Sequence, residues 1–209
     1  MSEQLLSIAA ADKTHCFVCF EALAAHLKSE PLPRFVEAVD AVPLFVTWKK
    51  QGRLRGCIGN LQPQAFPHGL VHYAIEAGVK DSRFDPMDFE ELTTCTVGVS
   101  LLVNFEPNLK WDEWEVGTHG IVIRFAVQGT HYKAVFLPEV AKDQGWTKKE
   151  TIEALIRKSG FKGRIDAKLL ESIKLERFVS SKIEATYVEW INARIETQMA
   201  VSNRLMSDW

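Results

Sequence analysis

The chain has 209 residues, of which 46% are hydrophobic and 25% charged, a composition typical of ordinary globular proteins. Its formal net charge is −2 at pH 7, so no global electrostatic field draws it to nucleic acid or to an anionic membrane. No uninterrupted apolar run approaches the roughly 20 residues that a membrane-spanning helix needs, and no membrane association is expected.

Helices and strands are predicted from hydrophobic periodicity, caps and turn residues. The predicted helices cover residues 15–28, 68–80, 147–160 and 186–205. The predicted strands cover residues 44–48, 54–58, 96–103, 120–127, 131–136 and 173–184. The dipeptides Gln51-Gly52 and Gln128-Gly129 turn neighbouring strands into hairpins.

Three of these elements carry finer predictions. Thr147 and Glu150 form a capping box that begins a helix, and Gly160 ends it. Residues 173–184 are expected to form a long edge strand. In the last helix, the apolar positions of one face are expected to be buried: Val188, Ile191, Ile195 and Met199.

The order of these elements decides the fold class. Strands and helices do not alternate regularly, and hairpins dominate, which predicts an α+β fold with an antiparallel sheet flanked by helices. No Pro/Gly/Ser-rich linker divides the chain, so two lobes would share a cleft and would not be joined by a flexible tether.

Cys57 is the first candidate for chemistry, because it lies in the segment Arg53-Leu-Arg-Gly-Cys-Ile-Gly59. A nearby guanidinium such as that of Arg55 favours the reactive thiolate. Gly56 and Gly59 allow a ligand or another backbone to approach closely. The alternative is an inert core cysteine in a central strand whose arginines point outward.

His119 and Arg83 are the other candidates. His119 lies between glycines where the second hairpin begins, and histidine is suited to proton transfer near neutral pH; the alternative is a histidine that caps its turn. Arg83 follows the buried helix and is flanked by Asp81 and Asp85. Its guanidinium either clamps a carboxylate or phosphate or forms an ion pair within the loop.

Neither a metal nor a cofactor is expected. His68, His72 and Glu76 share one helical face. In zinc peptidases the catalytic glutamate lies between the two histidine ligands in the sequence, whereas Glu76 follows both histidines. A polar stripe that faces solvent explains the spacing. No phosphate-binding loop or dinucleotide fingerprint is present in the sequence.

Several motifs in consistent order resemble the AMMECR-type domain, named for the AMME syndrome chromosomal region. They are Leu54-Arg-Gly-Cys-Ile-Gly59, Asp81-Ser-Arg-Phe84, Gly117-Thr-His-Gly-Ile-Val122, Leu137-Pro-Glu-Val-Ala141 and Gly145-Trp146. The resemblance implies a single two-lobed α+β domain over residues 1–209, with a larger lobe from both chain ends, a smaller lobe from the middle and a cleft between them. It brings no agreed reaction.

The leading functional prediction is an enzyme or binder of a small anionic molecule or peptide in the interlobe cleft. Cys57 would be the nucleophile or covalent contact, Arg55 or Arg83 the anion clamp and His119 the proton carrier. The main alternative is a non-catalytic interaction module whose protein partner the sequence does not name. A nucleic-acid role would need these cations on one face: Lys49, Lys50, Arg53, Arg55, Lys162 and Arg164.

Cysteine usage and the N-terminal residues predict the compartment. The first eleven residues carry Glu3 in place of a basic segment and have no long apolar stretch, which predicts no secretory signal. The four cysteines have no disulfide-like spacing, as in proteins of reducing compartments. We therefore expect a cytoplasmic or nuclear protein.

Overall fold

The computed structural model describes residues 10–32 and 41–207, so residues 1–9, on which the prediction of no secretory signal partly depends, lie outside the described residues. The chain forms two compact units. Unit 1 comprises Met1–Leu101 and Ser181–Trp209, and unit 2 comprises Leu102–Ser180. The expected cleft between the lobes stays a prediction.

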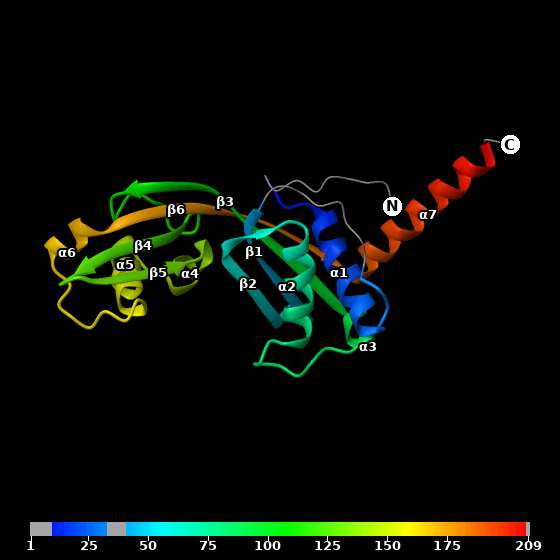
Figure 1. The fold of residues 1–209 in the computed structure, drawn as a ribbon, viewed down its shortest axis with the longest axis horizontal. Coiled ribbons are helices and arrows are strands. Elements are labelled where there is room, and N and C mark those ends of the chain that lie inside the picture. Colours follow the sequence, from blue (N-terminus) through cyan, green and yellow to red (C-terminus); the bar gives the residue numbers. More distant parts are fainter. Residues whose placement is uncertain (1–9, 33–40, 208–209) are drawn as a thin grey trace. The chain divides into compact units, whose positions relative to one another are not determined.

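In the described part of the chain, strands form a six-stranded sheet in the order β2-β1-β3-β6-β4-β5 (Figure 1). The strands are β1 (Ala41–Lys50), β2 (Arg53–Ala65), β3 (Cys95–Leu109), β4 (Gly120–Val127), β5 (Thr130–Phe136) and β6 (Lys174–Thr186). The helices are α1 (Lys13–Leu27), α2 (His68–Val79), α3 (Phe89–Leu92), α4 (Pro138–Gln144), α5 (Lys148–Lys158), α6 (Ala167–Ser172) and α7 (Tyr187–Ser207). The predicted α+β class, with an antiparallel sheet flanked by helices, is confirmed.

In unit 1, α2 packs on β1 and β2 and also contacts α1 (Figure 1). The indole of Trp48 in β1 is fully buried, and its Nε1–H donates to the carbonyl of Ala74 in α2 at 2.9 Å. Helix α1 begins at a capping box formed by Asp12 and His15. Burial of aromatic and aliphatic side chains between the helices and the strands supplies the main stabilisation of this unit.

Unit 2 has its own hydrophobic core. The hairpin of β4 and β5 turns at Gln128 and Gly129, both with positive φ, as the sequence predicts. Helix α5 begins at the predicted Thr147–Glu150 capping box. The cluster of buried side chains comprises Trp114, Ile121, Ile123, Phe125, Ala134, Ala141, Ile152, Leu155, Ile156, Phe161, Leu169, Ile173 and Leu175.

The prediction of an edge strand at residues 173–184 is wrong. Strand β6 lies between β3 and β4, and its pairing with β4 runs from Gly120 opposite Phe178 to Arg124 opposite Lys174. The edges of the sheet are β2 and β5. Alternation along a strand shows which residues face the core, but it does not show which strands lie on either side.

The prediction of a buried apolar face on the last helix is also wrong. Val188, Ile195 and Met199 are 63%, 49% and 60% exposed, Ile191 is partly buried, and the buried residue of the first turns is Trp190. Helix α7 packs on α1 through Tyr187 and Trp190, whose rings contact Phe20. Its later turns extend away from the other described elements of unit 1 (Figure 1). The apolar face that its sequence pattern predicts there is therefore not covered by a described helix or strand.

No helix within residues 10–32 and 41–207 is long and apolar enough to cross a membrane.

Candidate functional site

A β-bulge decides which way the Cys57 side chain points. The hairpin first pairs Lys50 with Arg53 and Lys49 with Leu54, but a register shift after these pairs places Thr47 opposite Cys57. Without the extra residue on β2, the simple hairpin register would set Cys57 opposite Val46, which is fully buried. A shift of one residue moves a strand's side chains to the opposite face of the sheet. The bulge therefore turns Cys57 away from the core and toward the face of Thr47.

Cys57 is partly exposed, whereas the other three cysteines are buried. The hydroxyl of Thr47 donates a hydrogen bond to Cys57 Sγ at 3.2 Å. Since β2 is an edge strand, the alternative of a cysteine in a central strand does not describe this residue. Nothing in the sequence pattern pointed to Thr47, because the bulge that brings it opposite Cys57 depends on packing.

The backbone of Cys57 is held by the loop after α2. Its N–H donates to Asp81 Oδ2 at 2.9 Å, and its carbonyl accepts from Arg83 Nη2 at 3.2 Å. These two side chains satisfy the groups that an edge strand leaves unpaired. The motifs at 54–59 and 81–84, far apart in the sequence, thus form one structural site in unit 1.

Asp81 and Arg83 form a two-pronged ion pair. Arg83 Nε donates to Asp81 Oδ1 at 2.8 Å and Nη2 donates to Oδ2 at 2.5 Å. The hydrogen bonds from Arg83, with smaller contributions from the backbone N–H groups of Cys57 and Arg83, hold the pKa of the Asp81 carboxyl well below its usual range. The Asp81 side chain is buried, while that of Arg83 is 54% exposed. The loop ion pair weighed for Arg83 is present, and it leaves part of the guanidinium in solvent.

Arg55 lies apart from this pair. Its Nε and Nη2 donate to the two carboxylate oxygens of Glu91 at 2.8 and 2.9 Å, and Nη2 also donates to the carbonyl of Asp85 at 2.7 Å. Glu91, to which no sequence motif pointed, therefore occupies the two guanidinium donors of Arg55 that would otherwise bind an anionic ligand. A ligand-binding role for Arg55 stays a prediction.

Gly56 and Gly59 are explained by backbone packing. An ideal Cβ on Gly56 would lie 1.9 Å from the carbonyl oxygen of Ala77 in α2. One on Gly59 would lie 2.2 Å from the carbonyl oxygen of Leu44 in β1. Both distances are far below contact, so each glycine is required where two backbones meet. Their predicted part in ligand binding is not needed to account for them.

His119 belongs to unit 2, and Cys57 belongs to unit 1. The backbone N–H of Glu115 donates to His119 Nδ1 at 2.9 Å, which places the ring hydrogen on Nε2. Partial burial, followed by the charge of Arg177, lowers the pKa of His119, so the ring is neutral at neutral pH. This hydrogen bond is the turn-capping contact weighed as an alternative, and the role of proton carrier stays a prediction.

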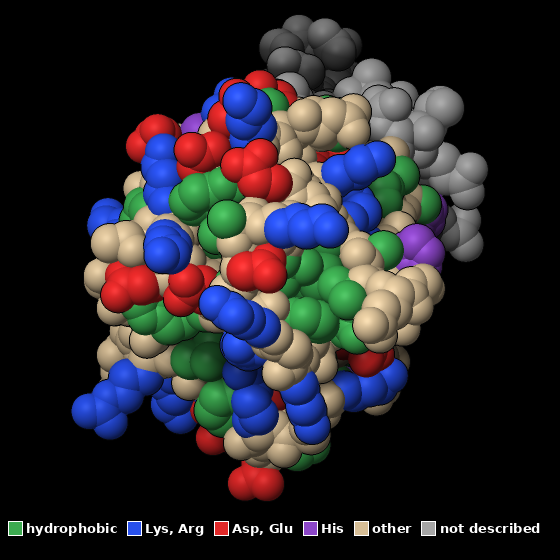
Figure 2. Space-filling model, turned by 90° about the vertical axis from the view of Figure 1, so that its left-hand side faces the viewer, with side chains coloured by type: hydrophobic (Ala, Val, Ile, Leu, Met, Phe, Trp, Pro, Cys, Tyr) green, Lys and Arg blue, Asp and Glu red, His purple; other side chains and the backbone are tan. Residues whose placement is uncertain are grey.

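The basic residues of the first hairpin are mostly paired with carboxylates. Lys49 contacts Glu184 at 2.5 Å, and Lys50 contacts Glu91 at 3.1 Å. In Figure 2, basic side chains lie among acidic and apolar ones.

Among the described residues, no group of three His, Cys, Asp or Glu side chains is placed to hold a metal ion.

The comparison with family models places these motifs in a known family. The AMMECR1 model matches residues 16–183, which is most of the chain and includes the Cys57 site. The chain belongs to the AMMECR1 family. The predicted resemblance to the AMMECR-type domain is thereby confirmed.

AMMECR1-family relatives extend over nearly the whole chain. An uncharacterized protein of Arabidopsis thaliana is 39% identical over 191 residues, covering 87% of this chain and 88% of its own. An uncharacterized protein of Schizosaccharomyces pombe is 35% identical over 187 residues, covering 86% of this chain and 95% of its own. The crystal structure of an uncharacterized protein of Pyrococcus horikoshii is similar with a TM-score of 0.65 and 25% identity, over 84% of this chain and 93% of that one. These relatives establish the family and the fold without assigning a reaction.

Alkylation of the folded protein by iodoacetamide at about pH 8 is expected to modify Cys57 alone. Burial raises the pKa of Cys16 to about 12 and that of Cys95 to about 11, and Cys19 is fully buried with a raised pKa. At this pH a thiol with a pKa near 11 has only about one thiolate in 10³ molecules. Intact-mass spectrometry should show one addition in the folded protein, none in Cys57→Ser, and four in denaturant. A second addition at a comparable rate would contradict this description of the thiols.

Proposed function

We propose that the protein binds a small anionic molecule at Cys57, with the Cys57 thiol as nucleophile or covalent contact and Arg83 as the anion contact. One observation carries the proposal: the half-exposed guanidinium of Arg83 donates to the backbone carbonyl of Cys57, whose thiol is partly exposed. Asp81 and the Cys57 carbonyl fix the Nε and Nη2 edge of Arg83, and Nη1 makes no hydrogen bond to a described residue. A fixed guanidinium with one open edge is suited to a carboxylate or phosphate oxygen.

The electrostatics of the loop support the same assignment. The pKa of Arg83 is raised, chiefly by its hydrogen bonds to Asp81, so its guanidinium stays charged. Because the Arg83 guanidinium donates to the Cys57 carbonyl, an anionic electrophile that contacts Arg83 is brought toward the same residue. Arg55 is not assigned this role, because Glu91 already occupies its guanidinium.

The test compares an anionic alkylating reagent, iodoacetate, with its neutral analogue, iodoacetamide. We expect the ratio of their rates at Cys57 to fall roughly fivefold in Arg83→Gln, because the attraction between opposite charges exposed to solvent is worth at most about 1 kcal/mol. The rates are measured by mass spectrometry of the Cys57 peptide.

Two variants serve as controls for this ratio. Arg83→Lys keeps the charge and should retain most of the preference for iodoacetate. Arg53→Gln removes a cation from the exposed end of the same strand and should leave the ratio unchanged. An equal ratio in wild type and Arg83→Gln would refute the role of Arg83 as anion contact.

A second candidate function, a non-catalytic interaction module, is favoured by the exposed apolar side chains of α7. Val188, Ile195 and Met199 lie at helical spacing on one face of that helix. An interaction through α7 does not involve the Cys57 thiol, so the two candidates differ in whether Cys57→Ser affects function.

A further inference from the structure

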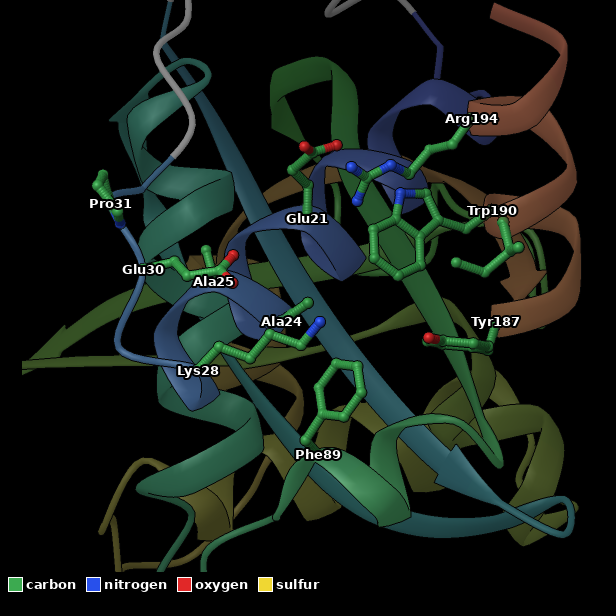
Figure 3. Close-up of a pocket in the computed structure, with 11 residues that line it drawn as sticks. Glu21, Ala24, Ala25, Lys28, Glu30, Pro31, Phe89, Tyr187, Trp190 and Arg194 are labelled. Carbon is green, nitrogen blue, oxygen red and sulfur yellow. The ribbon is translucent and has the colours of Figure 1, made fainter. Parts of the chain in front are cut away.

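A pocket of about 170 Å³ lies among α1, α3 and α7, all within unit 1. Aromatic rings and charged side chains of both signs line it (Figure 3). The rings are those of Phe89, Tyr187 and Trp190, and the charged side chains are Glu21, Lys28, Glu30 and Arg194. None of these residues belongs to the Cys57 site.

Trp190 in this pocket has an unsatisfied donor. Its ring stacks on Phe20 at 5.5 Å, contacts Tyr187 edge-on at 5.3 Å and is only 3% exposed. Among the described residues, its Nε1 is the one buried side-chain nitrogen or oxygen without a hydrogen-bond partner. Buried indole N–H groups usually find an acceptor. Figure 3 shows the nitrogen on the edge of the ring that faces the side chains of Glu21 and Arg194.

The two basic side chains of the pocket form cation–π contacts with aromatic rings. Lys28 Nζ lies 4.0 Å from the centre of the Phe89 ring, and the Arg194 guanidinium carbon lies 5.2 Å from that of Trp190. Neither forms an ion pair with a described carboxylate. Cation–π contacts leave the N–H groups of both side chains available to an acceptor. The indole N–H and the Arg194 guanidinium thus offer donors side by side (Figure 3).

Glu21 and Glu30 restrict the charge of a ligand. Each contributes a carboxylate to the lining, so a multiply charged anion such as a phosphate would meet repulsion. A single carboxylate needs only the donors of Trp190 and Arg194. The rings of Phe89 and Tyr187 offer apolar surface to the rest of such a molecule.

We propose that this pocket binds a small monocarboxylate with a flat apolar body. The carboxylate accepts from Trp190 Nε1–H and from the Arg194 guanidinium, and the apolar body packs against Phe89 and Tyr187. This site is separate from Cys57 and does not depend on the function proposed for it.

The test uses phenylacetate as the probe and neutral phenylacetamide as its matched control. The six tryptophans give indole N–H signals in a proton–nitrogen correlation spectrum, and Trp190→Phe identifies the Trp190 signal by its loss. We expect this signal to shift progressively with phenylacetate, with a dissociation constant on the order of 1 mM, and not with phenylacetamide. Arg194→Gln should weaken the binding about tenfold, as expected for loss of a charged hydrogen bond.

Three results of the binding experiment would overturn the proposal. They are an unmoved Trp190 signal at about 10 mM phenylacetate, an equal response to the amide, and unchanged affinity in Arg194→Gln. A Trp190 signal that Glu21→Gln alone shifts strongly would show that Glu21 accepts this hydrogen bond, which also overturns it. If Trp190→Phe does not fold, sequential assignment of the wild-type spectrum identifies the signal.

Discussion

Gly56→Ala is expected to lower the free energy of unfolding of the protein by about 3 kcal/mol or more. The added Cβ would lie 1.9 Å from the Ala77 carbonyl oxygen, which belongs to helix backbone and cannot rotate away as a side chain would. Helix α2 would have to move off β2, which separates packed surfaces and disturbs the loop that holds Cys57. Urea unfolding, followed by tryptophan fluorescence and circular dichroism, measures the change.

The control for this substitution is Gly52→Ala in the turn of the same hairpin. Gly52 has a φ of +74° but no heavy atom within 4 Å of an added Cβ, so only backbone strain of about 1 kcal/mol is expected. If Gly56→Ala were no more destabilising than Gly52→Ala, close backbone approach would not be the reason for glycine at position 56.

Asp81→Asn is expected to destabilise the protein by about 2 kcal/mol at neutral pH. The carboxylate accepts hydrogen bonds from the Cys57 N–H and from the N–H, Nε and Nη2 of Arg83. The amide of Asn has one acceptor oxygen and no charge, so it leaves donors unpaired. The loss stays below that of a fully buried ion pair, because solvent screens the half-exposed Arg83. Urea unfolding of both proteins over a range of pH measures it.

The pH dependence of this difference has a definite sign. The pKa of Asp81 is lower in the folded chain than in the unfolded chain, so the carboxylate stabilises the fold above the unfolded pKa of about 3.9. This stabilisation is lost as the pH falls below that value toward the folded pKa. Wild type and Asp81→Asn should therefore converge in stability between about pH 4 and pH 2. A constant difference over this range would contradict the ion-pair origin.

Glu106→Gln is the matched control for Asp81→Asn. Glu106 also binds an arginine, Arg177, with both carboxylate oxygens, but its side chain is 53% exposed. Exposed pairs contribute little to stability, so a much smaller loss than that of Asp81→Asn is expected. Equal losses would show that burial and the bond to Cys57 do not distinguish Asp81.

Local signals in the sequence were sufficient for most of the fold. Helices α1, α2 and α5 and the two hairpins follow from hydrophobic periodicity, the Thr147–Glu150 capping box and the Gln-Gly turns. The short helices α3, α4 and α6 were not predicted, because so few residues show no helical period. The inner position of β6 and the exposed apolar face of α7 depend on neighbouring elements, which a single segment does not encode.

The sequence by itself determined the family, the α+β class and the residue types of the candidate site: a thiol, two arginines, an aspartate and close-packed glycines. Tertiary structure alone decided how they are used. One extra residue in β2 turns Cys57 from the side of Val46 to that of Thr47, and the loop after α2 brings Asp81 and Arg83 to its backbone. The physical reason is that strand register and side-chain pairing are set by packing between segments distant in the chain, which local patterns do not specify.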